Sequence, residues 1–177
     1  MKRAVFLDRD GVINRKPPEG HYVTRWEEMQ FPPGVSEAIA LLTQAGFCVF
    51  TVTNQRCVAK GLLTANELES IHERMCQVLA AAGAVITKVY YCPHETHPPC
   101  DCRKPAPGML LRAAREHEIS LKTSWMIGDS DIDVEAGRNA GCRTVRIVKG
   151  DEVGSGGADL SAPSLIDAVQ KVLALES

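Results

Sequence analysis

The sequence predicts one α/β domain over residues 1–177, built on a single doubly wound, Rossmann-like parallel sheet. Three observations support this fold class. Short apolar runs alternate with helical patterns along the chain, which is typical of parallel strands joined by right-handed crossovers. A length of 177 residues suits one domain with its own core. Polar residues directly follow several of the apolar runs, where open α/β sheets bind their ligands.

Composition and charge restrict the class of protein further. Hydrophobic residues make up 45% of the chain and charged residues 24%, as in ordinary soluble globular proteins. A formal net charge of -2 gives no electrostatic basis for binding nucleic acid or an anionic membrane. No apolar run is long enough to span a bilayer, and the basic start lacks the apolar stretch of a signal peptide. A cytoplasmic protein is therefore expected.

Residues 4–7 are the first expected strand, an apolar run typical of a strand buried on both faces. It ends in Asp8-Arg9-Asp10-Gly11. Asp8 and Asp10 are two residues apart, so in an extended chain they point to the same side. Two such charges favour a cation or a proton between them. Because Asp and Gly are also turn residues, a polar turn is the alternative interpretation.

A flap is expected over the end of this strand. The stretch of about residues 14–29 is irregular, and its Pro and Gly residues exclude a helix at its start. Since it follows the Asp-x-Asp motif, it could bring Lys16, Glu19 and His21 to a bound ligand. A solvated loop is the alternative for each of these side chains.

Four more strands and five helices complete the alternation. Strands are predicted at residues 47–52, 85–91, 124–127 and 144–148. Helices are predicted at residues 35–45, 65–82, 108–117, 134–139 and 164–173. Thr64 and Glu67 form a capping-box pattern before the second helix. His72 and His117 lie in helical stretches and are expected at the surface, and a glycine-rich loop is expected at residues 150–158.

Polar clusters follow one predicted strand after another. Thr53-Asn54-Gln55 ends the second strand, Arg103-Lys104 follows the loop after the third, and Asp129 and Asp133 follow the fourth. Because the carboxyl ends of parallel strands meet at one edge of the sheet, these clusters are expected to converge with the Asp-x-Asp motif in an active site. A helix N-cap is the alternative role for the Thr-Asn pair.

Carboxylates beside a lysine suit the transfer of a phosphoryl group. Asp8 is best placed to attack phosphorus and form an aspartyl-phosphate. Asp10 could protonate the leaving oxygen and later deprotonate the hydrolytic water. Thr53 and Lys104 would hold the phosphoryl oxygens.

A Mg²⁺ ion is the expected cofactor, because carboxylate oxygens are the ligands that it prefers. Its expected ligands are Asp8, Asp10 and Asp129. Asp133, which starts a helix four residues later, would support this site or merely cap the helix.

The cysteines predict a second metal site. The chain has 7 Cys and no export signal, which argues against a disulfide framework. Cys92-x-His94 and Cys100-x-Cys102 together form a Cys₃His set suited to tetrahedral Zn²⁺. Four protein ligands make a closed, structural site that would order the loop at residues 92–102. A chance cluster is the alternative.

The motifs, in this order, resemble those of the haloacid dehalogenase superfamily of phosphatases. They are Asp8-x-Asp10-Gly11-Val12-Ile13, the strand ending in Thr53, Lys104, and Gly128-Asp129-x-x-x-Asp133. Three longer matches resemble the D-glycero-D-manno-heptose-1,7-bisphosphate 7-phosphatase family, whose histidinol-phosphate phosphatase relatives share most of them. These matches are residues 6–14, residues 53–55 and residues 102–109.

The resemblance implies a small phosphorylated sugar as substrate and Mg²⁺-dependent hydrolysis through phospho-Asp8. The heptose family removes the 7-phosphate in nucleotide-activated heptose biosynthesis, which serves lipopolysaccharide. Sugar or second-phosphate contacts are implied for the flap at Lys16 to Glu19, for Asn54, Gln55 and Arg56, and for Arg103. A structural zinc is implied at Cys92, His94, Cys100 and Cys102.

The chain departs from this family in two places. Arg56-Cys57 stands where the family usually continues with Ser-Gly, which places an extra cation beside the phosphate site. The stretch at residues 95–99 is shorter than usual, so His97 is an alternative to His94 as zinc ligand. The motif spacing also leaves no room for the cap domain of larger superfamily members.

Two other functions fit part of the pattern. One is a phosphatase of histidinol phosphate or another small phosphomonoester. The other is a non-catalytic domain phosphorylated on Asp, like a response-regulator receiver. Asp10, the zinc loop and the place of Asp8 after the first strand argue against a receiver. The lack of a long exposed apolar stripe favours a monomer.

Overall fold

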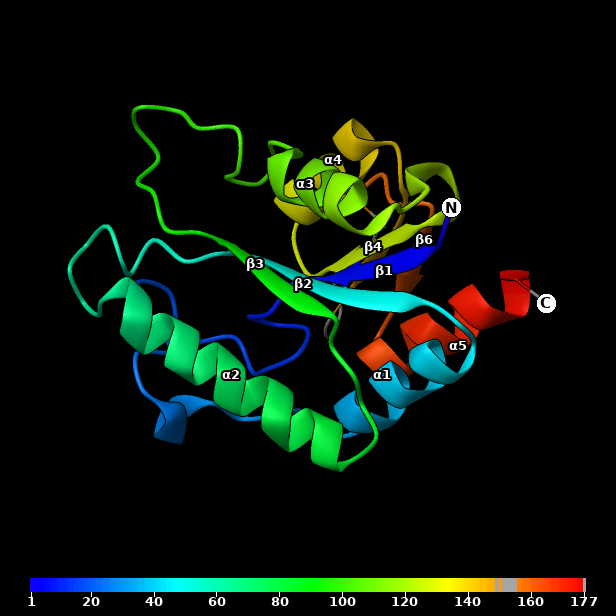
Figure 1. The fold of residues 1–177 in the computed structure, drawn as a ribbon, viewed down its shortest axis with the longest axis horizontal. Helices are drawn as coiled ribbons and strands as arrows, with labels where there is room; N and C mark the ends of the chain where they lie inside the picture. Colours follow the sequence, from blue (N-terminus) through cyan, green and yellow to red (C-terminus); the bar gives the residue numbers. More distant parts are fainter. Residues whose placement is uncertain (149, 151–155, 177) are drawn as a thin grey trace.

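Within residues 1–148, 150 and 156–176, which the computed structural model describes, six strands form one parallel sheet in the order β3-β2-β1-β4-β5-β6. The strands are β1 Ala4–Leu7, β2 Cys48–Asn54, β3 Lys88–Cys92, β4 Trp125–Gly128, β5 Arg143–Ile147 and β6 Leu160–Ala162. β1 lies between β2 and β4, in the middle of the sheet (Figure 1). The carboxyl end of β1, where Asp8 follows, therefore lies at the centre of the sheet edge formed by the carboxyl ends of the strands.

Helices cover both faces of the sheet. They are α1 Val35–Gln44, α2 Ala65–Ala81, α3 Gly108–His117, α4 Asp131–Ala140 and α5 Leu165–Glu176, with short 3-10 helices at Trp26–Glu28 and Leu121–Thr123. α1, α2 and α5 lie on one side and α3 and α4 on the other (Figure 1). The sheet has one hydrophobic core on each face. Val5 and Leu7 pack into the core under α1, α2 and α5, and Ala4 and Phe6 pack into the core under α3 and α4. β1 is thus buried on both faces, as its apolar run predicts.

The predicted doubly wound parallel sheet is confirmed, and differences are confined to element ends and one short strand. β6 has three residues and no apolar run, so periodicity does not reveal it. α4 begins at Asp131, before the predicted residue 134, because Ser130 and Asp133 form a capping box there. The capping box of Thr64 and Glu67 is confirmed at the start of α2.

Two surface predictions are wrong. His72 is buried, with 4% of its surface exposed, because it lies on the inner side of α2. His117 is half-buried, and its ring centroid is 4.9 Å from that of Phe50. Most of the glycine-rich loop predicted at residues 150–158 lies outside the described residues. Among the described helices, none combines the length and apolar character needed to cross a bilayer.

Candidate active site

Polar side chains from several segments meet at the carboxyl edge of the sheet, around the end of β1. The cavity between them and the flap measures about 280 Å³. The predicted site residues that line it are Asp8, Asp10, Lys16, Glu19, His21, Thr53, Asn54, Lys104, Asp129 and Asp133. Tyr22, Ser130 and Ile132 also line it. The expected convergence of the strand ends therefore occurs, and the flap lies over it.

Lys104 is the central cation of this cavity. Its Nζ lies 2.8 Å from Asp8 Oδ1 and 2.6 Å from Asp133 Oδ1, and it donates to the carbonyl oxygen of Val52 at 2.9 Å. These three acceptors match the three protons of an ammonium group. Lys104, Asp8 and Asp133 are all buried, so the lysine is locked between two carboxylates.

Burial and neighbouring charges set the pKa of Asp8, the proposed nucleophile. Desolvation raises the pKa of Asp8 to about 7, and the charges of Asp133 and Asp10 act in the same direction while Lys104 opposes them. Burial works against the charge of Lys104, yet the two carboxylates raise the pKa of its ammonium above the ordinary value. Lys104 therefore stays charged at neutral pH and supports the anionic form of Asp8.

Three carboxylates form a group that could hold a divalent cation. One carboxylate oxygen from each of Asp8, Asp129 and Asp133 lies within 4.8 Å of the other two. Asp129 Oδ1 is buried and has no hydrogen-bond partner among the described residues, while its Oδ2 accepts from Lys16 Nζ at 2.8 Å. An oxygen-only set with one unused buried oxygen fits Mg²⁺. Asp133 takes the place in this group that the sequence assigns to Asp10.

Asp10 is held instead by a dense set of donors. Arg9 Nη2 donates to both carboxylate oxygens at 3.0 Å, Asn14 Nδ2 to Oδ1 at 2.9 Å, and Gln55 Nε2 to Oδ2 at 2.8 Å. Burial opposes ionisation, but the guanidinium charge and these hydrogen bonds outweigh it and lower the pKa of Asp10. The fold thus keeps Asp10 as a carboxylate, the form that can accept a proton.

Asn54, the last residue of β2, and Gln55, which follows it, bind groups that line the cavity. Gln55 is fully buried, and its amide nitrogen donates to Thr53 Oγ1 at 2.9 Å as well as to Asp10. Asn54 exchanges two 3.0 Å hydrogen bonds with the backbone of Lys104 while still lining the cavity. Gln55 therefore orients Thr53 and Asp10, and Asn54 fixes the backbone at Lys104.

Arg56 and Arg103 do not line the 280 Å³ cavity. Arg56 Nε pairs with Glu95 Oε2 at 2.7 Å, and Arg103 Nη1 donates to the carbonyl oxygen of His94 at 3.2 Å. Both cations instead bind the loop that follows β3.

Gly11 shows how tightly the site is built. Its φ is +101°, a left-handed conformation that glycine adopts at little cost. A Cβ at this position would lie 2.2 Å from Asp129 Oδ2. Gly11 therefore allows the chain after β1 to approach the carboxylate that follows β4.

The Cys₃His group gathers as the sequence predicts. The ligand atoms of Cys92, His94, Cys100 and Cys102 all lie within 4.8 Å of one another. Sulfur–sulfur and sulfur–nitrogen distances of 3.2 to 3.6 Å close the ring of four. This set and spacing suit a tetrahedral Zn²⁺. The group contains His94, and His97 is not part of it.

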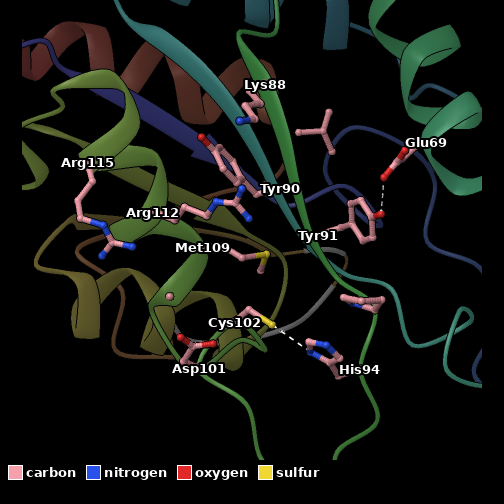
Figure 2. Close-up of a pocket in the computed structure, with 13 residues that line it drawn as sticks. Glu69, Lys88, Tyr90, Tyr91, His94, Asp101, Cys102, Met109, Arg112 and Arg115 are labelled. Carbon is pink, nitrogen blue, oxygen red and sulfur yellow. Dashed lines mark hydrogen bonds between the residues drawn. The ribbon is translucent and has the colours of Figure 1, made fainter. Parts of the chain in front are cut away.

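A second cavity, of about 540 Å³, lies between β3, α3 and this cysteine loop. Figure 2 shows His94 and Cys102 pointing toward each other at one end of it and Lys88 at the other, with Tyr90 and Arg112 between. Lys88 and Arg112 on its wall are both paired with Glu116, at 2.7 Å each. Although it is larger, this cavity lacks the carboxylate–lysine cluster found at the end of β1.

Comparisons with known proteins agree with this geometry. A family model described as HAD-hydrolase-like matches residues 101–169. The D-glycero-beta-D-manno-heptose-1,7-bisphosphate 7-phosphatase of Pseudomonas aeruginosa is 38% identical over 167 residues, which cover 94% of this chain and 93% of that protein. The protein of the same name from Yersinia pestis is 37% identical over 182 residues, covering 97% and 95%.

Solved structures give the same result. The D,D-heptose 1,7-bisphosphate phosphatase of B. bronchiseptica, crystallised with magnesium and phosphate, superposes with a TM-score of 0.88 at 33% identity and covers 99% of both chains. The corresponding enzyme from Burkholderia thailandensis has a TM-score of 0.71 at 29% identity, covering 97% of this chain and 99% of its own.

Proposed function

Because this chain belongs to the heptose-1,7-bisphosphate 7-phosphatase family of HAD-like hydrolases, we propose that it removes the 7-phosphate of D-glycero-D-manno-heptose 1,7-bisphosphate. The observation that carries this proposal is the buried Asp8–Lys104 pair, 2.8 Å apart, at the centre of the cavity under the flap. A carboxylate beside a fixed cation can attack a phosphoryl group whose oxygens that cation neutralises.

The reaction follows from the placement of these groups. Asp10 first takes up a proton, because its resting form is the carboxylate. An Asp8 oxygen then attacks phosphorus, and the bond from phosphorus to the sugar oxygen breaks while Asp10 passes its proton to that oxygen. Water then attacks the phosphorus of phospho-Asp8 and passes a proton to Asp10, which regenerates the Asp8 carboxylate and releases phosphate. Lys104 and Thr53 hold the phosphoryl oxygens during both steps.

A Mg²⁺ ion would be held by Asp8 and Asp129, with Asp10 or Asp133 as a further ligand. When bound, it would neutralise phosphoryl charge and orient the group for in-line displacement. The flap residues Lys16 and Glu19, which line the cavity, would contact the sugar or its second phosphate. Lys16 is the cation best placed for that contact, because it lines the cavity and its Nζ lies 2.8 Å from Asp129 Oδ2, whereas Arg56 and Arg103 bind the loop after β3.

The substrate is tested by comparing kcat/KM with Mg²⁺ for both anomers of heptose 1,7-bisphosphate and for histidinol phosphate. We expect a preference of about a hundredfold or more for a heptose bisphosphate, which equals about 2.7 kcal/mol in transition-state binding. A preference for histidinol phosphate would contradict the substrate and leave the phosphatase chemistry standing. Absence of turnover on any phosphomonoester would instead favour a receiver-like domain.

The partners follow from the same proposal. A small phosphorylated sugar would be bound in the cytoplasm by a monomer, without nucleic acid or membrane. The formal net charge of -2 supports this, because nucleic acid and anionic membranes attract proteins with basic surfaces.

Zinc at the cysteine loop is proposed as a structural cofactor, and replacing Cys100 by Ser tests it. We expect zinc content to fall from about one ion per chain to nearly none, because a three-ligand remnant binds much more weakly. KM should rise, because Lys104 follows the loop that the metal would order. Elemental analysis and steady-state kinetics measure the two effects.

Cys76→Ser is the matched control, since Cys76 is a half-buried cysteine on α2 outside the Cys₃His group. It should keep the full metal content. Unchanged zinc in Cys100→Ser would contradict the proposed site.

A further inference from the structure

A buried arginine and a buried histidine lie behind Asp10. Arg9 has 0% and His72 has 4% of its surface exposed, and both are absent from the described residues that line the 280 Å³ cavity. Arg9 Nη2 binds both oxygens of Asp10 at 3.0 Å, and Arg9 Nη1 lies 3.0 Å from His72 Nε2. A chain of contacts therefore runs from α2 through Arg9 to the carboxylate in the cavity.

The direction of the Arg9–His72 hydrogen bond follows from the chemistry of the two groups. A guanidinium group can only donate, so His72 Nε2 must accept, and the ring proton must be on Nδ1. Burial, together with the positive charge of Arg9, lowers the pKa of His72 to about 3. The imidazole therefore remains a neutral acceptor.

His72 Nε2 is the hydrogen-bond acceptor that Arg9 Nη1 needs. Asp10 takes the N–H groups on one side of the guanidinium, at Nε and Nη2. The Nη1 side is buried with the rest of Arg9, which has 0% of its surface exposed, and a buried N–H group without an acceptor is costly. His72 supplies that acceptor from α2, so in this orientation each of the three guanidinium nitrogens of Arg9 has a hydrogen-bond partner.

We propose that His72 is a positioning residue, which fixes the Arg9 guanidinium and through it the carboxylate of Asp10 for proton transfer. The proposal rests on the proposed phosphatase function. It assigns a task in the reaction to a helix that contributes no residue to the cavity lining among the described residues.

The leaving group of the substrate distinguishes this role from a merely structural one. A sugar alkoxide needs the proton that Asp10 supplies, whereas p-nitrophenolate leaves as a stable anion without it. The ratio kcat/KM reports the steps up to formation of phospho-Asp8. A defect in proton transfer therefore lowers kcat/KM for the sugar phosphate and spares p-nitrophenyl phosphate.

His72→Leu is expected to lower kcat/KM for heptose 1,7-bisphosphate by about tenfold or more, a fraction of what general acid catalysis provides. The loss should lie in kcat, with KM nearly unchanged. With p-nitrophenyl phosphate, kcat/KM should change by less than about threefold. Asp10→Asn should show the same pattern with a larger loss on the sugar.

A pair of amide variants keeps the test valid if His72→Leu does not fold. His72→Gln can place its amide oxygen near the Nε2 position and should recover most of the activity on the sugar. His72→Asn is too short to reach Arg9 and should behave like His72→Leu. Tyr91→Phe is the control, because its ring neighbours His72 at 5.7 Å while its hydroxyl binds Glu69 (Figure 2) and not Arg9.

Equal losses on the two substrates, or a His72→Gln variant no better than His72→Asn, would overturn the positioning role while the phosphatase function stands. Absence of turnover by the wild-type protein on both substrates would overturn the function and the positioning role together.

Discussion

Replacing Asp8 by Asn should abolish phosphatase activity and, in metal-free buffer above pH 7, raise thermal stability. The amide cannot form the aspartyl-phosphate, so kcat should fall by about 10⁴-fold or more, as for other covalent nucleophiles. The variant should still fold, since the amide keeps the size of the side chain.

The gain in stability follows from the pKa of the carboxyl. Burial raises the pKa of Asp8 in the folded chain to about 7 from the ordinary value of 3.8. Its contribution to stability is therefore fully present below about pH 4 and is lost as the pH rises through 7. An uncharged amide avoids that loss, so the Tm difference in favour of Asp8→Asn should appear between pH 4 and 7 and persist above it.

Calorimetry in EDTA at pH 5 and pH 8, beside an activity assay with Mg²⁺, measures both effects. Asp101→Asn is the control, because Asp101 is exposed on the cysteine loop. A variant that was less stable than the wild type at pH 8 would show that the Asp8–Lys104 attraction exceeds the cost of burying the charge. Retained turnover would show that Asp8 is not the nucleophile.

Replacing Lys104 by Met should have the second large effect. The substitution leaves Asp8 and Asp133 buried together without the ammonium that lies 2.8 and 2.6 Å from them. Breaking a buried ion pair by removing one partner costs about 3–5 kcal/mol. At roughly 2–4 °C per kcal/mol for a chain of this size, Tm should fall by about 10 °C at pH 8. Activity should fall by at least about a hundredfold, since a group that stabilises phosphoryl charge is lost.

The destabilisation of Lys104→Met should shrink as the pH falls. Lys104 is the main group that opposes the raised pKa of Asp8, so without it that pKa rises further. The folded variant then keeps the Asp8 proton at a pH where the folded wild type has already lost it, because the wild-type pKa is about 7. The Tm deficit should therefore shrink as the pH falls from above 7 to about 7, and it should stay constant below that, where both folded chains carry the proton. A Tm deficit that was the same at pH 8 and pH 5 would contradict this account.

Lys88→Met is the matched control for this prediction. Lys88 also forms a 2.7 Å ion pair with a carboxylate, Glu116, but its side chain is 44% exposed. An exposed pair contributes about 0–1 kcal/mol. The same substitution should therefore lower Tm by no more than a few degrees and leave activity unchanged.

The sequence predicts most of the fold because the central strands are apolar runs that end in polar residues. A short apolar run bounded by polar residues fits a buried strand and is too short for a typical buried helix. The start of α4 is harder, because the same Asp133 that reads as an active-site carboxylate also caps the helix. β6 is too short for any period to appear.

Part of the candidate site can also be predicted from the sequence. The convergence of Asp8, Lys104 and Asp129 follows from parallel strands sharing one edge. The orientation of Arg56 and Arg103 does not follow, because a neighbour such as Glu95 can turn a long side chain away from the site.

The buried place of His72 had a signal in the sequence. Leu68 and Met75 lie on the inner face of α2. His72 comes four residues after Leu68 and three residues before Met75, and this spacing places it on the same face of the helix. A polar residue on an apolar helix face predicts a buried partner, but the spacing along α2 does not say that the partner is Arg9.

The arrangement of the strands also bears on self-association. Strands at sheet edges offer unpaired backbone groups to other molecules, and short or lysine-bearing edges limit this. One edge here is β6, with three residues, and the other is β3, which begins with Lys88. The apolar strands β1, β2 and β4 lie inside the sheet, so molecules that meet in a concentrated solution present the edge strands, which are the least able to pair.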